Sequence, residues 1–229
     1  MPKPTNRIYK FSDADLKQKA DSTGASMKRD EAEFKGRGVT DALTLAFIDS
    51  STDFGNMDSD EMWIGNVTTA TQAKDALAES QKKKMRNIRN MAEIKFTVKS
   101  GSYRSYGFEN MDELSDNKLV RLGRRVLTVA TAQQADLAGQ GLDAAALTGL
   151  ATNVNALDAA VDTKHNAEKD RDVAQQNRVE AGNALYTLMD TYCSIGKTIW
   201  ADDPARFNDY VIYPGGADTA PPPPPPPNN

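Results

Sequence analysis

The sequence of 229 residues contains a single cysteine, Cys193, and a single histidine, His165. One cysteine excludes a disulfide within the chain and any metal site built from several thiolates. One histidine excludes sites that need two imidazoles, including the paired Glu-x-x-His motifs of di-iron helical bundles. Because no nucleophile–base pair is visible either, we expect a protein that is not an enzyme and that uses no metal or cofactor.

Proline is absent from residues 5–203, although the chain has 11 prolines. Proline breaks helix interiors because it lacks the amide donor and clashes with the preceding turn. No segment alternates apolar and polar residues well enough to indicate a strand, except the sequence Tyr-Val-Ile-Tyr at 210–213. The sequence therefore predicts an all-α protein.

Glycine, serine and asparagine clusters divide the proline-free region into expected helices. Ser12 begins the first helix in a variant of the capping box with Asp15, and a glycine break at 36–38 ends it. The polar and acidic segment 49–60 is expected to be a loop. The other expected helices span residues 40–49, 59–99, 111–137, 142–199 and 204–209.

The longest expected helix, 142–199, carries an uneven apolar seam. Its first part has apolar residues at alternating spacings of three and four, the spacing of coiled-coil core positions: Leu147, Leu150, Val154, Leu157 and Val161. The same frame then meets charged and polar residues, while alanines recur every seven positions at 160, 167, 174 and 181. We expect an elongated antiparallel helical bundle or coiled-coil hairpin with two apolar ends and a thin waist.

Aromatic residues are absent between Phe108 and Tyr186. This distribution predicts that both chain ends meet at one thicker end of the molecule. We expect an N-terminal extension at 1–11, a helical bundle at 12–200, a C-terminal aromatic segment at 201–213 and a disordered proline-rich tail at 214–229. The proline run at 221–227 is typical of a stiff polyproline II segment, as a spacer or as a ligand for a partner.

Basic residues gather in the middle of a chain whose formal net charge is −4, which is not typical of a general nucleic-acid binder. This basic cluster comprises Lys82, Lys83, Lys84, Arg86, Arg89, Lys95, Lys99, Arg104, Lys118, Arg121, Arg124 and Arg125. Three aromatic residues, Tyr103, Tyr106 and Phe108, lie within it and are candidate partner contacts. Two interpretations stay open: a solvated face paired with acidic residues, or a surface for single-stranded nucleic acid or an anionic membrane.

Residues 192–200, Tyr-Cys-Ser-Ile-Gly-Lys-Thr-Ile-Trp, are followed at 205–213 by Ala-Arg-Phe-Asn-Asp-Tyr-Val-Ile-Tyr. These two segments resemble the C-terminal end of uncharacterised helical proteins from Bacteroidota. The resemblance covers a small part of the chain. It implies a bacterial helical protein whose tyrosine- and tryptophan-rich end is structural, and it brings no activity or site.

The leading hypothesis is a non-enzymatic structural or interaction protein, a scaffold or assembly component whose main partner is itself or another protein. One alternative is a membrane-interacting helical bundle of the toxin type, although the chain has no long apolar segment. Another is a nucleic-acid-binding module that uses the basic residues of 82–125. Without a signal peptide or a spanning segment, the expected location is the cytoplasm, and a virion or cell-surface protein is equally compatible with the sequence.

Overall fold

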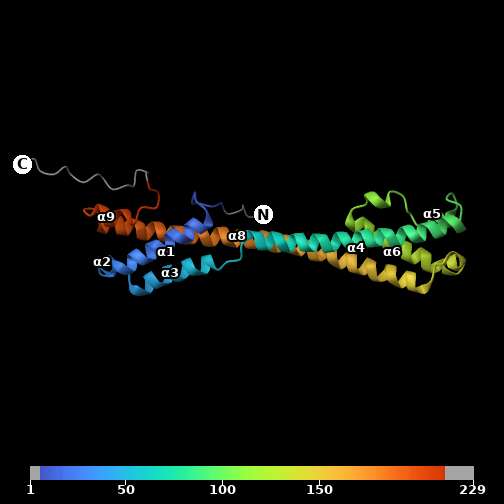
Figure 1. Cartoon of the computed structure of the whole chain (residues 1–229), viewed down its shortest axis with the longest axis horizontal. Helices are drawn as coiled ribbons and strands as arrows, with labels where there is room; N and C mark the ends of the chain where they lie inside the picture. Colours follow the sequence, from blue (N-terminus) through green and yellow to red (C-terminus); the bar gives the residue numbers. More distant parts are fainter. Residues whose placement is uncertain (1–5, 215–229) are drawn as a thin grey trace, which may run out of the picture. The chain divides into compact units, whose positions relative to one another are not determined.

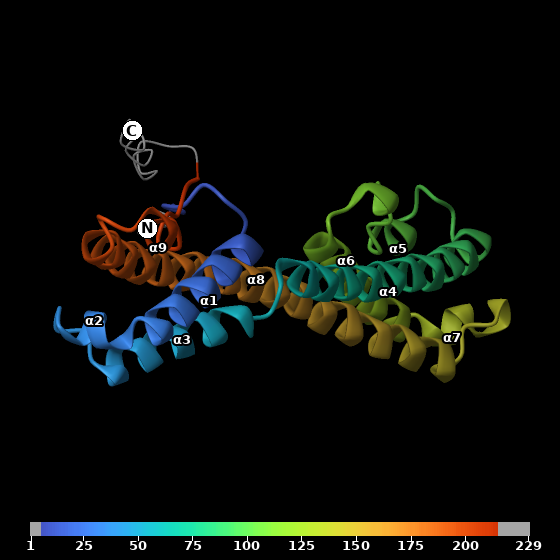
Figure 2. The same ribbon diagram turned by 60° about the vertical axis from the view of Figure 1, so that its left-hand side comes forward.

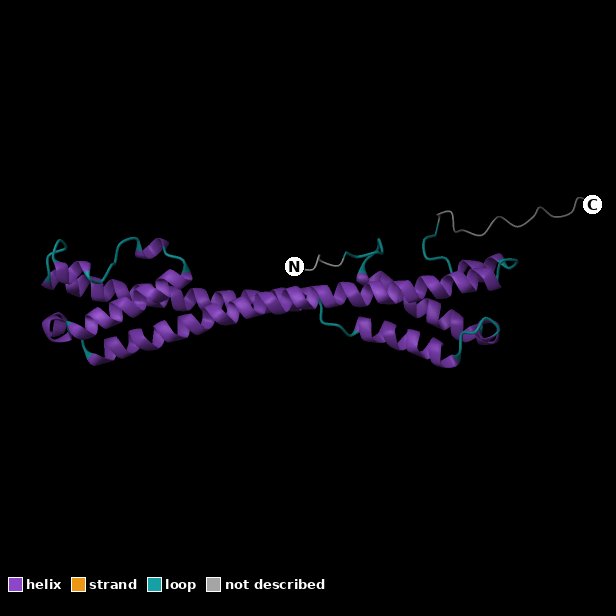
Figure 3. Cartoon of the chain, turned by 180° about the vertical axis from the view of Figure 1, so that it is seen from behind, coloured by secondary structure: helices purple, strands orange, loops and turns teal. Residues whose placement is uncertain are grey.

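A computed structural model describes residues 6–214 of the chain. Every regular element in this range is a helix, so the predicted all-α class is confirmed (Figure 3). Two compact units divide the described residues. The terminal unit comprises residues 6–59 and 173–214, and the central unit comprises residues 60–172. No helix among the described residues has the length and apolar character needed to cross a membrane.

The terminal unit is built from both ends of the chain (Figure 1). It contains helices α1 (Asp13–Arg29), α2 (Glu31–Lys35), α3 (Asp41–Gly55) and α9 (Pro204–Asn208), together with residues 173–199 of α8 (Ala144–Ile199). Its core is rich in aromatic rings: Phe47 meets Tyr192 edge-on at 5.3 Å between ring centroids, and Phe34 packs at 5.6 Å from Tyr210. Rings from the first and the last part of the described chain thus share one core, which agrees with their distribution in the sequence.

The first helix begins as predicted and ends earlier than predicted. Ser12 and Asp15 form a complete capping box at the start of α1. The helix stops at Arg29, because Asp30 leaves helical geometry (φ −101°, ψ 29°) and its fully buried carboxylate accepts a 2.8 Å hydrogen bond from the hydroxyl of Tyr210. A tertiary contact with the far end of the chain thus divides the predicted helix into α1 and α2.

The predicted loop at 49–60 is wrong over its first half, because α3 continues to Gly55. Two residues in this stretch, Ser51 and Phe54, are buried. The Ser51 hydroxyl donates a 2.8 Å hydrogen bond to Asp21 on α1, and the guanidinium of Arg178 lies 5.4 Å from the centre of the Phe54 ring. These contacts hold a helix that the polar composition alone did not predict.

The suggested strand at 210–213 is also absent, and the segment is irregular. Its alternation has another cause: Tyr210 and Ile212 point into the core of the terminal unit, where both are buried. Gly196 makes this possible, because a Cβ atom at that position would lie 2.4 Å from the Tyr210 ring. Before this segment, α9 begins where predicted, and the side chain of Asp203 caps it by accepting from the backbone N–H groups of Ala205 and Arg206.

The central unit is formed by α4 (Asp60–Lys95), α5 (Gly101–Arg104), α6 (Asp116–Ala132), α7 (Gln134–Leu137), two short 3-10 helices η1 (Met111–Glu113) and η2 (Ala138–Gln140), and residues 144–172 of α8 (Figure 2). The predicted helix 111–137 is therefore divided into η1, α6 and α7. Aliphatic residues dominate the core of this unit.

Three helices of the central unit meet at Gly123 on α6. A Cβ atom there would lie 2.4 Å from the Gln81 amide nitrogen on α4 and 2.7 Å from a methyl group of Val154 on α8. Gln81 is fully buried and donates a 2.6 Å hydrogen bond to the Leu119 carbonyl of α6. Asn153 of α8 likewise donates to the Leu77 carbonyl of α4 at 2.9 Å. The helices are thus joined by side-chain amides as well as by apolar contact.

The burial of the apolar seam predicted on α8 differs between the two parts of the helix. Leu147, Leu150, Val154 and Leu157 are buried, and Val161 is half-buried. No residue from 158 to 181 is buried, and burial resumes at Gly182 and Leu185. The predicted proline-rich tail lies, from residue 215 onward, outside the described residues, as do the first five residues of the predicted extension.

Candidate functional site

The basic cluster predicted from the sequence lies on the central unit, on α4, α5, α6 and the loops between them. Four of its members are held by acidic neighbours. Lys82 pairs with Glu79 at 2.9 Å, Arg89 with Glu93 at 3.6 Å and Arg124 with Asp158 at 2.6 Å, and Arg86 pairs with Asp112. For these four cations the interpretation of a solvated face with acidic partners is adequate.

The other members of the basic cluster make no ion pair with any residue in the range 6–214. They are Lys83, Lys84, Lys95, Lys99, Arg104, Lys118, Arg121 and Arg125. All except Lys84 are exposed to solvent. The structure therefore separates the predicted cluster into a paired set and an unpaired set, a distinction that the sequence alone does not contain.

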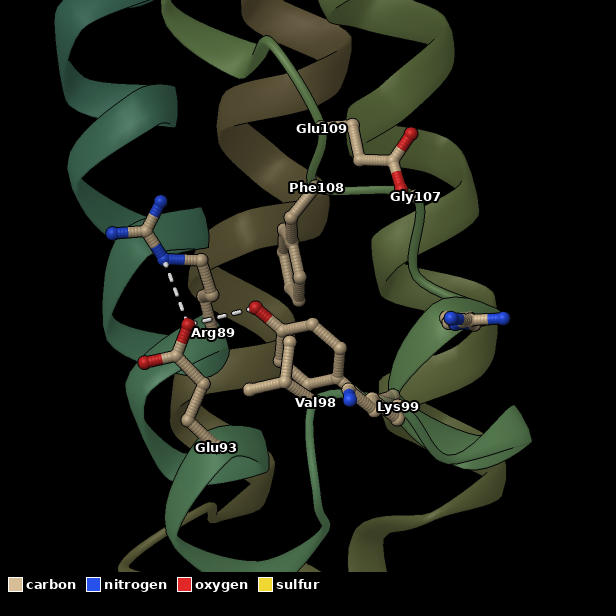
Figure 4. Close-up of a pocket in the computed structure, with 9 residues that line it drawn as sticks. Arg89, Glu93, Val98, Lys99, Gly107, Phe108 and Glu109 are labelled. Atoms are coloured by element: carbon tan, nitrogen blue, oxygen red, sulfur yellow. Dashed lines mark hydrogen bonds and ion pairs between the residues drawn. The ribbon is translucent and has the colours of Figure 1, made fainter.

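Five of the unpaired cations border two hollows that adjoin each other. The first hollow, of about 280 Å³, lies beside Lys99 and Arg104, and Figure 4 shows the Phe108 ring directed into it. The second, of about 540 Å³, is bordered by Lys118, Arg121 and Arg125. The two hollows share Gly107 and Glu109, so they form one continuous surface.

Gly107 is needed where the two hollows meet. Its φ of +70° lies in the left-handed region, which costs little only for glycine, and a Cβ atom there would lie 2.8 Å from the Arg125 guanidinium. The Arg125 side chain can therefore lie across the loop backbone. The loop conformation and the position of this cation depend on the same residue.

Acidic residues balance part of the charge in the first hollow. Glu93 accepts a 2.7 Å hydrogen bond from the Tyr103 hydroxyl and pairs with Arg89 (Figure 4). Burial, together with the hydrogen bond to Glu93, raises the pKa of Tyr103 to about 12, so the phenol is neutral at physiological pH. Glu109 is exposed and forms no ion pair within the described range, so it reduces the positive potential of the surface locally.

The aromatic residues predicted to contact a partner are placed differently from the cations. Tyr106 is fully buried, and Phe108 is 7% exposed and stacks on it at 5.0 Å between ring centroids. Both belong to the core of the central unit, and Tyr103 is half-buried against Glu93. Neither Tyr106 nor Phe108 presents an open ring face on which a nucleic-acid base could stack, whereas the half-buried Tyr103 lines the first hollow.

A second notable surface is the apolar residue pair at the end of α4. Ile94 is 77% exposed and Val98 is 57% exposed. The unpaired cations Lys95 and Lys99 adjoin them in the chain, and Arg104 lines the first hollow together with Val98. Sequence reasoning included these cations and missed both aliphatic residues. The signal was present, since Ile94 and Val98 lie outside the apolar stripe of Met85, Ile88 and Ala92 that α4 buries.

The lone cysteine and the acidic residues show no reactive arrangement in the described part of the chain. Cys193 is buried, and burial raises the pKa of its thiol to about 11, which keeps it protonated. Among residues 6–214, no group of three or more His, Cys, Asp and Glu side chains could hold a metal ion. The comparisons with known proteins add no assignment: no family model, no curated protein and no solved structure matches this chain.

Proposed function

We propose that this chain is a non-enzymatic helical interaction protein that associates with itself through the first half of α4. The observation that carries the proposal is the burial pattern of this helix. From Asp60 to Leu77 no residue is buried, whereas the second half of the same helix buries Ala78, Gln81, Met85, Ile88 and Ala92. Helices in folded proteins normally bury their apolar stripe, so an uncovered stripe indicates a missing partner.

The uncovered half of α4 carries the kind of side chains that a partner would bury. Trp63 and Val67 are only half-buried, and Ile64 beside them is 55% exposed. Tryptophan is among the residues that contribute most to protein interfaces. Full burial of one isoleucine side chain contributes about 1.5 to 3 kcal/mol. A second copy that covered these residues would therefore stabilise the association substantially.

The adjacent part of α8 supports the same proposal. In the central unit, Ala160, Val161 and Ala167 are half-buried, and Lys164 pairs with Glu168 at 2.6 Å on the same seam. Small residues at one heptad position allow close helix approach, and charged residues beside them set register. The antiparallel bundle or coiled-coil hairpin predicted from the sequence belongs to this proposal, with the second copy completing the bundle around these helices.

Light scattering during size-exclusion chromatography tests self-association directly. We expect the full chain to have at least twice the mass of one 24.9 kDa chain. Ile64→Asp should reduce the mass to that of a single chain, because a buried unpaired carboxylate is costly. Ile94→Asp replaces an even more exposed isoleucine of the same helix and should leave the mass unchanged. A wild-type chain that stays monomeric over the accessible concentrations would refute the proposal.

A further inference from the structure

We propose that the end of α4 and the turn after it form a docking surface for an anionic lipid bilayer. This surface, the α4 tip, comprises Ile94, Lys95, Val98, Lys99 and Arg104. Its partner is the charged headgroup layer of the membrane, and the chain is docked on that layer without spanning it. The inference is independent of self-association, which uses the opposite half of the same helix.

The first argument is the exposure of the two aliphatic residues. Ile94 has the largest exposed fraction among the exposed large apolar residues of the described range, and Val98 is second only to Val173 among the valines. Both lie at the end of an element, Ile94 in the last turn of α4 and Val98 in the turn that follows. Side chains at such an end can enter the boundary between headgroups and acyl chains without displacing the helix core.

The second argument is charge complementarity. Lys95, Lys99 and Arg104 are exposed and have no ion-pair partner in residues 6–214, so their charges are available to an external anion. The acidic residues Glu93 and Glu109, which line the first hollow with Lys99 and Arg104, repel an external anion only weakly. Glu93 is already paired with Arg89 and hydrogen-bonded to Tyr103, and Glu109 is the one unpaired acid on the adjoining hollow. Each basic residue near an anionic bilayer increases affinity about fivefold.

The third argument separates a membrane from a nucleic acid. Single-stranded nucleic acids are bound through exposed aromatic rings as well as cations. At this surface Tyr106 and Phe108 are buried in the core and Tyr103 is half-buried with its hydroxyl bound to Glu93, while the exposed apolar side chains are aliphatic. Aliphatic side chains give no stacking surface for a base, but they gain free energy on entering a bilayer. The combination of cations with exposed aliphatics therefore favours a lipid surface.

Co-sedimentation of the full chain with vesicles tests the docking surface. We expect binding to vesicles of phosphatidylcholine mixed with phosphatidylserine, and none to vesicles of phosphatidylcholine alone. The double variant Ile94→Ser/Val98→Ser keeps every charge and should weaken binding about tenfold or more. The double variant Lys95→Gln/Lys99→Gln keeps both aliphatics and should weaken it by a similar factor, about five for each lysine removed.

Matched control variants make the result specific to the α4 tip. Lys83→Gln removes an exposed, unpaired cation about 18 Å further back along α4, and Leu45→Ser removes an exposed leucine of α3, outside both proposed surfaces. Both controls should bind vesicles as the wild type does. Because all these side chains are exposed, circular dichroism should show unchanged helix content for every variant.

Three outcomes would overturn the inference. The first is no binding of the wild type to the mixed vesicles. The second is equal weakening by the tip variants and the controls, which would indicate a diffuse charge effect. The third is that an RNA or DNA oligonucleotide competes with vesicles for the protein and that Ile94→Ser/Val98→Ser leaves the oligonucleotide affinity unchanged. That result would assign the cations to a nucleic acid.

Discussion

The terminal and central units differ in how they use their charged side chains. In the terminal unit, cations join distant parts of the chain: Arg178 of α8 pairs with Asp13 of α1 at 2.7 Å, and Arg206 reaches the buried carboxylate of Asp30 at 3.4 Å. In the central unit, eight basic residues of the cluster have no ion pair within the described range. Ion pairs join separate helices in both units, as Lys74 of α4 with Asp116 of α6 shows for the central unit, and the cluster of unpaired cations sets the central unit apart.

The two cores differ in a corresponding way. The terminal core contains rings from the N-terminal segment, from α2 and α3 and from the C-terminal segment, and it encloses Asp30. The central core is largely aliphatic, with Tyr106 and Phe108 as its buried rings. Aromatic rings and a buried carboxylate demand specific partners, whereas aliphatic packing demands little beyond volume.

The largest expected effect tests whether the two cores are energetically separate. Phe47→Ala removes a ring that is 1% exposed in the terminal core and should cost about 3 to 5 kcal/mol of unfolding free energy there. Hydrogen exchange should show faster exchange of amides in α1 and α3, with α6 unchanged, because the cores share no buried residue. Leu119→Ala, in the central core, should speed amide exchange in α6 and leave α1 and α3 unchanged. Equal loss of protection in both units would contradict this separation.

A smaller effect is expected from the buried carboxylate of the terminal unit. The hydrogen bonds from Arg29 and then from Tyr210 outweigh burial and hold the pKa of Asp30 below its ordinary value of 3.8. Its stabilisation is therefore complete above that ordinary pKa and is lost as the pH falls through the lowered pKa of the folded state. Asp30→Asn should cost about 1.5 to 3 kcal/mol at neutral pH and reduce this acid dependence.

The matched control for Asp30 lies on the central unit. Asp158 also accepts from an arginine, Arg124, at 2.6 Å, but both side chains are about half exposed. Asp158→Asn should cost at most about 1 kcal/mol, as is typical of exposed ion pairs. Denaturant unfolding at neutral and acidic pH measures both variants. Equal costs for the two substitutions would contradict the distinction between charges inside and outside the fold.

The smallest expected effect concerns Gly123, where three helices of the central unit meet. Gly123→Ala places a methyl group against Gln81 and Val154 and should cost about 1 to 2 kcal/mol, since overpacking exceeds the gain in helix propensity. Gly149→Ala on α8 is the control, because the nearest atom to its added Cβ is the Lys84 amine at 3.5 Å. That variant should be neutral or stabilising in thermal unfolding. A neutral Gly123→Ala would show that the aliphatic core adapts more easily than we infer.

Much of the fold could be predicted because local signals determine the helices. The absence of proline, the capping box at Ser12 and the glycine breaks are short-range features, and they locate the start of α1 and both ends of α4 and α8 to within a few residues. The errors arise where tertiary contacts decide. Asp30 breaks a helix because Tyr210 meets it, and α3 continues because Phe54 is buried. No local pattern contains a contact between residues 180 positions apart.

The sequence predicts which residues of the candidate site are charged, but not which of its side chains are unpaired or exposed. The sequence located every cation of the basic cluster, because charge is a property of the residue itself. Ion pairs such as that of Arg86 with Asp112 join separate elements, so the paired and unpaired sets emerged only from the structure. The sequence placed Tyr106 and Phe108 among the candidate partner contacts, but both are buried. Their burial depends on how the loop around Gly107 folds back, which no local pattern reveals.

The discontinuous composition of the terminal unit has a consequence for synthesis on the ribosome. Translation delivers the whole central unit, residues 60–172, before it delivers the residues of α8 and the C-terminal segment that complete the terminal core. The rings of Phe34, Phe47 and Phe54 must therefore wait in the nascent polypeptide until Tyr192 and Tyr210 emerge. The part of the chain that is made first is among the last to be finished.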